Sequence, residues 1–217
     1  MSKFALKIAV CGLVLAFSLP ITAQTSTFTD SRDGKSYRTI TIGNRTWMGE
    51  NLNIETGNSW CYENNMGNCQ KYGRLYDWNT AMKACPAEWR LPTRQDWNNL
   101  AREVGGNKVD GRNLKSAIGW NSNGNGTNSF GFSALPGGAA HRDGNSIDFD
   151  DIGNLGIWWS ATENNDLREI NAIRRETGMN ISAGSLAYAR AMNLEDYALE
   201  ISTVLKSSGF SVRCVRD

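Results

Sequence analysis

The sequence predicts an α+β fold from three observations. A β-hairpin signal lies early in the chain, two short helical patterns follow it, and β-rich runs alternate with Gly- and Asn-rich segments toward the carboxyl end. The chain has 217 residues, 40% hydrophobic and 21% charged, as is typical of one globular domain. Its 23 basic and 22 acidic residues nearly cancel without forming a basic cluster, so nucleic acid is not expected as a partner.

Residues 1–23 have the three parts of a secretory signal peptide. Two lysines precede an apolar run over 8–19, and Ala23 offers a small residue for cleavage. The run is about a dozen residues long, whereas a membrane-spanning helix needs about 20. We therefore expect an exported chain with no transmembrane span after processing and with a single domain over residues 24–217.

Four cysteines follow the signal segment, and an even number in an exported chain predicts two disulfides. Three pairings are possible by arithmetic alone. Locality favours Cys61 with Cys69, because they flank a turn-rich stretch, and leaves Cys85 with Cys214. Chain entropy gives roughly 2.5 kcal/mol for the short loop and roughly 4 to 5 kcal/mol for the long one. A four-thiolate zinc site is the alternative, although no C-x-x-C spacing occurs.

The first expected elements are the two strands of a hairpin. The β-rich runs 37–42 and 45–48 are separated by Gly43-Asn44. A two-residue turn of this kind between β-rich runs predicts a tight antiparallel pair. The folded region is therefore expected to open with β structure.

Two short helices are expected next. Asp77 precedes apolar residues at helical spacing over 78–85, and Pro86 ends the pattern. Thr93 is expected to cap a second helix, in which apolar residues recur at i, i+3, i+4 and i+7 before a pair of glycines. Both helices should present one apolar face to the core.

Beyond the second helix, regular periodicity is weak. Residues 119–156 are dense in Gly, Asn, Asp and Ser, and we expect an ordered loop region anchored by Trp120, Phe130, Phe132, Leu135, Ile147 and Phe149. Segment 166–177 is expected to form a helix. The remaining β-rich runs predict strands over 157–162, 186–192, 198–204 and 210–215.

Several residue strings resemble a known family. They are GKSYRTITIGNRTWMGENLN (34–53), KYGRLYDW (71–78), ACPAEWRLPT (84–93), FGFSALPGG (130–138), WWSATE (158–163) and SVRCV (211–215). Together they resemble the Fibrobacter succinogenes major paralogous domain, in its motif order and over the whole region from about residue 30 to 217. Residues 164–197 depart from the family pattern, because this segment is longer and less aromatic than the family's usual connection.

The resemblance implies an exported or cell-surface bacterial protein with a C-type-lectin-like fold. Such a fold has two short helices, a small twisted antiparallel sheet and a long ordered loop region. For the family, surface adhesion and polysaccharide attachment are the implied activities. The fold also resembles that of the formylglycine-generating oxidases, whose chemistry depends on reactive cysteine thiols.

The search for catalytic residues gives no complete set. The only histidine is His141, and no G-x-S-x-G motif accompanies it, so nucleophilic hydrolysis is not expected. No pair of carboxylates stands out for glycoside cleavage. An oxidase would need free thiols, whereas the expected disulfides use all four cysteines. The sequence therefore predicts a protein without catalytic activity.

Oxygen donors are concentrated in one part of the loop region. Carboxylate and amide oxygens suit Ca²⁺, and the candidate ligands are Asp143, Asn145, Asp148, Asp150 and Asp151. The order of these residues is not that of an EF-hand, and a solvated acidic loop is the alternative interpretation. The resemblance to lectin-like folds favours Ca²⁺, although the sugar-binding strings of those lectins are absent.

Carbohydrate recognition needs an aromatic face for the sugar ring and polar groups for its hydroxyls. Two tryptophans precede such groups. Trp120 is followed by Asn123 and Asn125, and Trp158 is followed by Glu163 and Asn164. The alternative for both rings is packing in the core.

The sequence thus supports three hypotheses. The first is a binding module, secreted, periplasmic or on the outer cell surface, that attaches to polysaccharide or another surface partner. The second is a structural or protein-interaction component of the cell envelope. The third is an enzyme related to the formylglycine-generating oxidases.

Overall fold

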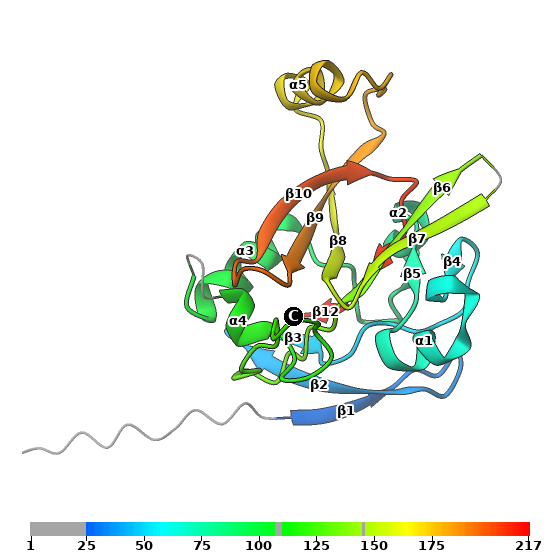
Figure 1. The fold of residues 1–217 in the computed structure, drawn as a ribbon. Helices are drawn as coiled ribbons and strands as arrows, with labels where there is room; N and C mark the ends of the chain where they lie inside the picture. Colours follow the sequence, from blue (N-terminus) through cyan, green and yellow to red (C-terminus); the bar gives the residue numbers. More distant parts are fainter. Residues whose placement is uncertain (1–24, 107–109, 145) are drawn as a thin grey trace, which may run out of the picture.

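The computed structural model describes residues 25–106, 110–144 and 146–217, so the expected signal peptide lies outside the described residues. The fold of this part is α+β, as expected, with five α-helices and three β-sheets (Figure 1). No helix in these ranges is long and apolar enough to cross a bilayer. The helices are α1 (Met66–Tyr72), α2 (Trp78–Ala84), α3 (Arg94–Glu103), α4 (Asp110–Leu114) and α5 (Leu167–Thr177).

The strands pair antiparallel except for one parallel contact between β11 and β8. The four-stranded sheet runs in the order β1 (Thr25–Thr29), β2 (Ser36–Ile42), β3 (Arg45–Met48), β12 (Val215–Arg216). The six-stranded sheet runs in the order β10 (Glu200–Leu205), β9 (Leu186–Asn193), β8 (Leu155–Glu163), β11 (Phe210–Ser211), β5 (Leu75–Tyr76), β4 (Ser59–Trp60). A separate hairpin pairs β6 (Gly137–Asp143) with β7 (Ser146–Ile152).

The predicted hairpin and both predicted helices are confirmed. β2 and β3 pair across Gly43-Asn44, with Ile42 opposite Arg45. Asp77 caps α2 by accepting a hydrogen bond from Thr80 N, and Thr93 caps α3 in a reciprocal capping box with Asp96. The turn and the two caps depend only on residues close in sequence, and each forms at the position predicted.

Aromatic rings from distant elements fill the core beneath α3. The Trp97 ring lies 4.9 Å from that of Trp47, 6.1 Å from Phe132 and 6.5 Å from Trp158, centroid to centroid. All four side chains are almost completely buried. Tilted and edge-on pairs of this kind stabilise a core beyond the area that they bury. This cluster fixes α3 against both large sheets.

The loop expected over 119–156 is only partly a loop. Trp120 and Phe132 do anchor it, but residues 137–143 and 146–152 pair as the two strands of the β6–β7 hairpin. In β7, Ile147 and Phe149 alternate with acidic residues and pack on the cluster that contains Tyr62. This alternation is typical of a strand, but the aspartates made the segment resemble a polar loop. The strand expected over 210–215 is divided as well, because β11 and β12 belong to different sheets.

Both expected disulfides are present. Cys61 is bonded to Cys69 and Cys85 to Cys214, with Cα–Cα distances of 5.0 and 5.8 Å. The second bond connects the end of α2 to the residue before β12. Elements 129 residues apart in sequence are thereby held together.

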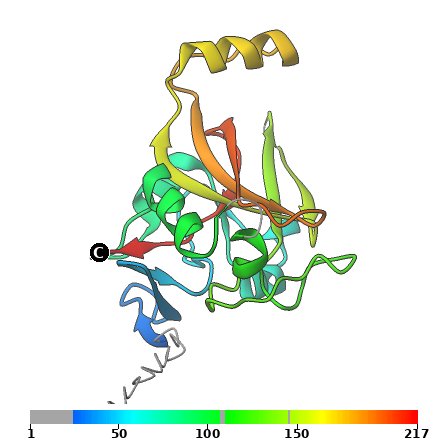
Figure 2. The same ribbon diagram turned by 90° about the vertical axis from the view of Figure 1, so that its left-hand side faces the viewer.

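The helix predicted within 166–177 is confirmed as α5, and its position is distinctive. Figures 1 and 2 show α5 projecting from one end of the molecule, beyond the β8–β9 pair. Its few apolar contacts form a small cluster of their own around Ile170, Ile181 and Leu186. We call residues 165–184 the α5 arm.

Candidate functional site

The two tryptophans proposed as sugar platforms lie in the core. Trp120 is 5% exposed, and Trp158 is completely buried. Their indole N–H groups donate to Ala134 O (3.0 Å) and to Asn51 Oδ1 (2.8 Å). A ring needs an open face to stack on a sugar, and neither ring has one. Both tryptophans therefore pack in the core, which was the alternative to a sugar platform.

The polar residues expected beside these rings serve local structure. Asn125 accepts a hydrogen bond from Trp120 N (3.0 Å), whereas Asn123 is exposed in the loop. Asn164 is buried and bonds Thr203 and the amide of Asp166, while Glu163 pairs with Lys206 at 2.7 Å. The structure therefore does not assemble these residues around a platform.

The acidic residues proposed as calcium ligands are spread along the β6–β7 hairpin. Asp143 ends β6, whereas Asp148, Asp150 and Asp151 lie on β7, all of them exposed, and Asn145 lies outside the described residues. Asp150 instead pairs with His141 at 3.3 Å. In the ranges that the structure describes, no three His, Cys, Asp or Glu side chains come together as a metal site.

A buried polar network offers a different centre. Asn51 Oδ1 accepts from Trp158 Nε1 and from Arg213 Nε (3.1 Å) and Nη2 (2.7 Å). Its Nδ2 donates to Tyr72 O (2.8 Å) and Ser211 Oγ (3.3 Å). We call these five residues the Asn51 network. One amide therefore satisfies groups on β8, β11, the end of α1 and the segment before β12.

Arg213 places a positive charge inside the core. Its side chain is completely buried, and no carboxylate of the described residues pairs with it. The guanidinium donates instead to Asn51 and to the backbone oxygens of Met48 (3.2 Å), Phe132 and Ser133 (3.4 Å). Burial lowers the pKa of Arg213 to about 9, so it is charged at neutral pH. These oxygen dipoles, together with the Phe132 ring, whose centre lies 4.3 Å from the guanidinium carbon, compensate the charge.

A groove of ≈ 270 Å³ opens directly above this network, between β2 and the end of α1. We call it the β2–α1 groove. Its apolar lining comes from Tyr37, Tyr72 and Leu135. Its polar lining comprises Ser36, Asn51, Asn53, Gln70 and Ser133, with the charged groups Lys35, Arg38, Glu50 and Lys71. Asn51 and Tyr72 belong both to the groove and to the Asn51 network.

Two local features shape the groove. Gly73 ends α1 with φ 80°, and a Cβ added there would meet Asn51 Cβ at 2.6 Å, so only glycine permits this close approach. Tyr37 Oη accepts from Asn53 N (3.1 Å), and burial raises the pKa of Tyr37 to about 12. The phenol therefore keeps its proton at neutral pH.

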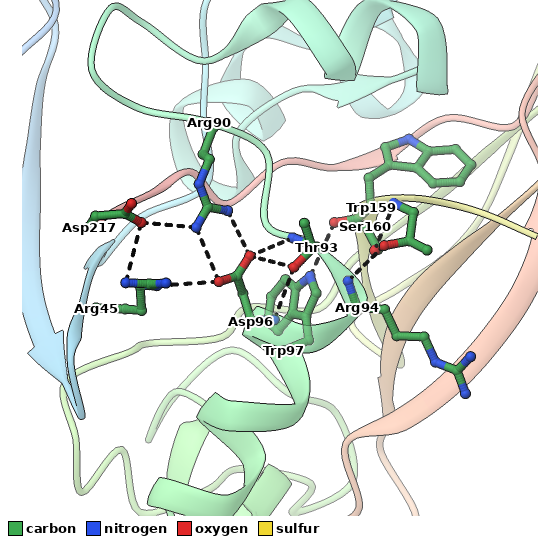
Figure 3. Close-up of polar contacts among 10 residues, drawn as sticks. Arg45, Arg90, Thr93, Arg94, Asp96, Trp97, Trp159, Ser160 and Asp217 are labelled. Carbon is green, nitrogen blue, oxygen red and sulfur yellow. Dashed lines mark hydrogen bonds and ion pairs between the residues drawn. The ribbon is translucent and has the colours of Figure 1, made fainter.

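A second polar cluster surrounds the start of α3 (Figure 3). Asp96 accepts from Thr93 N (2.8 Å), Thr93 Oγ1 (2.6 Å), Arg90 Nη1 (2.6 Å) and Arg45 Nε (3.3 Å). Burial alone would raise the pKa of Asp96, but the hydrogen bonds from Arg90 and Thr93 outweigh it and hold that pKa well below its usual range. Asp217 also pairs with both arginines. These charges are paired with one another, so the cluster stabilises the helix start.

The groove was not predicted from the sequence. Except for Cys69 and Gln70, its residues come from strings far apart in the chain, namely 34–53, 71–78 and 130–138, and Arg213 beneath it comes from 211–215. These strings also carry the family resemblance. The family resemblance was the one feature of the sequence that could have indicated the groove, because its Asn, Tyr and Arg residues are irregularly spaced and show no periodicity.

The comparisons with known proteins agree with this resemblance. The sequence matches the Fibrobacter succinogenes major domain over residues 40–216. No curated protein and no solved structure matches the chain. The matched region includes every residue of the Asn51 network and most of the groove. The chain belongs to the Fibrobacter succinogenes major domain family.

Proposed function

We propose that this protein is a noncovalent binding module for polysaccharide and that the β2–α1 groove is its binding site. The observation that carries the proposal is the composition of the groove, in which an apolar wall faces amides, hydroxyls and charges. The two disulfides are typical of an oxidising compartment, so the proposed location is secreted, periplasmic or on the outer cell surface.

The chemistry of the lining suits sugars. Leu135, which is half-buried, offers apolar surface for the C–H groups of a sugar ring, and the largely buried Tyr37 and Tyr72 support this wall from below without an open stacking face. Amide groups of Asn53 and Gln70 can both donate and accept, as the hydroxyls of a sugar require. Small-molecule sites commonly combine an apolar wall with a few placed polar groups.

The rigidity of the groove floor favours binding. Asn51 is held by bonds to Trp158, Arg213 and Ser211, so it has no freedom to lose when a ligand arrives. A preformed site avoids part of the ordering cost of association. The C-type-lectin-like architecture belongs to the proposal as well, since α2, α3, the antiparallel sheets and the long connection after α4 fit that description.

The oxidase hypothesis is less well supported. Oxidase chemistry of this kind needs cysteine thiols, whereas the four cysteines of the described residues form two disulfides. Cys69 lines the groove, but its sulfur is bonded to Cys61. We therefore propose binding without catalysis.

The test is a binding panel with a blocked-groove variant. Gln70 is exposed on α1 and lines the groove, so Gln70→Trp should fill it and weaken polysaccharide binding at least about tenfold, as loss of most site contacts would. Gln95→Trp, an exposed glutamine on α3, is the matched control and should bind as wild type does. Hydrogen exchange should show protection of residues 35–38 and 69–73 on binding. Equal binding by both variants would overturn the proposal.

A second candidate is interaction with a protein of the cell envelope, favoured by the α5 arm. The arm projects from the body (Figure 2), and Leu167 and Met179 on it are 61% and 54% exposed. Replacing residues 165–184 by a short Gly-Ser turn should abolish capture of a purified envelope partner and leave polysaccharide binding unchanged. Retained capture would exclude the arm from this role.

A further inference from the structure

We infer that the β2–α1 groove selects polysaccharides carrying an acidic group, a carboxylate or a sulfate, over neutral ones. This inference rests on the proposed function and names its ligand class. Three cationic side chains line the groove, Lys35, Arg38 and Lys71, against one carboxylate, Glu50. The lining alone therefore favours a negative ligand.

The charge beneath the floor adds to this preference. Arg213 contacts Asn51 and Ser133, which both line the groove, and no acidic side chain of the described residues forms an ion pair with it, although Glu50 lies close enough to offset part of its charge. Because the guanidinium is fully buried, water screens it less than a surface charge. Its field therefore reaches the groove through two polar residues.

Pairing leaves one lining cation available. Glu50 pairs with Arg38, and Asp33 pairs with Lys35 at 3.0 Å. Lys71 forms no ion pair with any described residue, and its Nζ lies 4.7 Å from the centre of the Tyr72 ring. In and around the groove there are thus four positive side chains, Lys35, Arg38, Lys71 and Arg213, and two negative ones, Glu50 and Asp33. Lys71 is exposed, so it can turn toward a ligand without breaking a salt bridge.

The arrangement suggests how the acidic group is held. Lys71 at the mouth supplies the charge contact, and the half-buried Leu135 in the lining supplies apolar surface for the sugar that bears the acid. Amides of Asn53 and Gln70 remain for neighbouring hydroxyls. Uronic acids and sulfated sugars both have this chemistry.

The experiment compares probes that share a backbone but differ in charge. Cellulose is compared with carboxymethyl cellulose, and dextran with dextran sulfate, using the full-length processed protein. We expect tighter binding of the acidic member of at least one pair, weakened as salt rises from about 50 to 500 mM. Preference for only one of the two acidic probes would identify the carboxylate or the sulfate as the recognised group.

Two variants locate the effect. Lys71→Gln should weaken binding of the acidic probe about fivefold, the size expected for one partly exposed charge contact, and should not change binding of the neutral probe. Lys83→Gln, which removes an exposed lysine from α2 outside the groove, is the matched control.

The outcomes separate this inference from the proposal beneath it. Equal binding of acidic and neutral probes, or equal effects of the two lysine variants, would overturn the inference and leave a neutral-glycan module. Absence of binding to every probe would overturn both.

Discussion

Asn51 shows how one side chain can serve both the core and the surface. Its amide satisfies donors from Trp158 and Arg213 on one side and an acceptor of Tyr72 on the other, and it also lines the β2–α1 groove. A buried donor left without a partner costs about 1–3 kcal/mol. Asn51 therefore contributes both to stability and to the proposed ligand site, so a variant that tests only the site has to change a neighbouring residue instead.

Asn51→Ala is expected to lower the free energy of unfolding by about 3 kcal/mol or more, since it leaves donors of both Trp158 and Arg213 unsatisfied. Urea denaturation followed by tryptophan fluorescence measures this loss. Asn53→Ala is the control, because Asn53 lines the groove and bonds Lys35 and Tyr37 through its backbone oxygen and nitrogen. Equal loss in the two variants would contradict a central role for Asn51.

Asp96 should make stability depend on acid pH. Its pKa is lower in the folded protein than in the unfolded chain, so its contribution is complete above about pH 4 and is lost as pH falls toward the folded value. Asp96→Asn should therefore destabilise the protein at pH 6, with a difference that shrinks at pH 2 to 3. Denaturation curves across this range provide the measurement, and a constant difference would argue against the assignment.

For single residues, the sequence predicted the helix N-caps but not the residues of the groove. Asp77 and Thr93 act within four residues of themselves, so their roles were visible in the chain. Trp120 and Trp158 were proposed as platforms because polar residues follow them, yet following in sequence does not imply exposure. The partners of Asn51 lie up to 162 residues away, which no local pattern encodes.

Among the elements, the β2–β3 hairpin and the helices α2, α3 and α5 were predictable, because each carries its own turn or cap. The strands β5, β11 and β12 are two residues long and pair with distant partners. β5 was not predicted, and the run 210–215 was predicted as one strand, because composition does not show that its two ends pair in different sheets. The β6–β7 hairpin was missed for another reason. Its apolar alternation is present, but the acidic residues on its other face resemble a loop.

The α5 arm is expected to be the first site of limited proteolysis. Its apolar contacts are few and local, and Arg175 is exposed, so trypsin should reach it before the body of the protein. Cleavage there should leave two fragments that migrate together without reductant, because Cys85 and Cys214 lie on opposite sides of the cut. Mass spectrometry identifies the first site, and an initial cut within α3 would contradict this order.

For the whole molecule, the disulfides should contribute unequally. The Cys85–Cys214 bond spans 129 residues and the Cys61–Cys69 bond spans 8. Removing the long-range pair by double alanine substitution should cost about 5 kcal/mol, and removing the short-range pair about 2.5 kcal/mol, if chain entropy dominates. Equilibrium denaturation of both double variants tests this, and equal losses would show that another contribution prevails.

The α+β class and both disulfide pairings could be predicted from the chain, whereas the relation between the three sheets could not. The carboxyl-terminal residues 210–216 pair with β5, β8 and β3, so they complete two sheets whose other strands come from earlier in the chain. This closure positions Arg213 and, with it, the floor of the groove.

The β2–α1 groove has a buried, hydrogen-bonded floor and a solvent-exposed rim. Asn51 and Arg213 are tied into the interior, whereas Gln70 and Lys71 stand in solvent on one short helix. Substitutions at the latter pair would change the lining of the groove while leaving its scaffold intact. If the groove is the binding site that we propose, related chains can differ in specificity through a single helical turn.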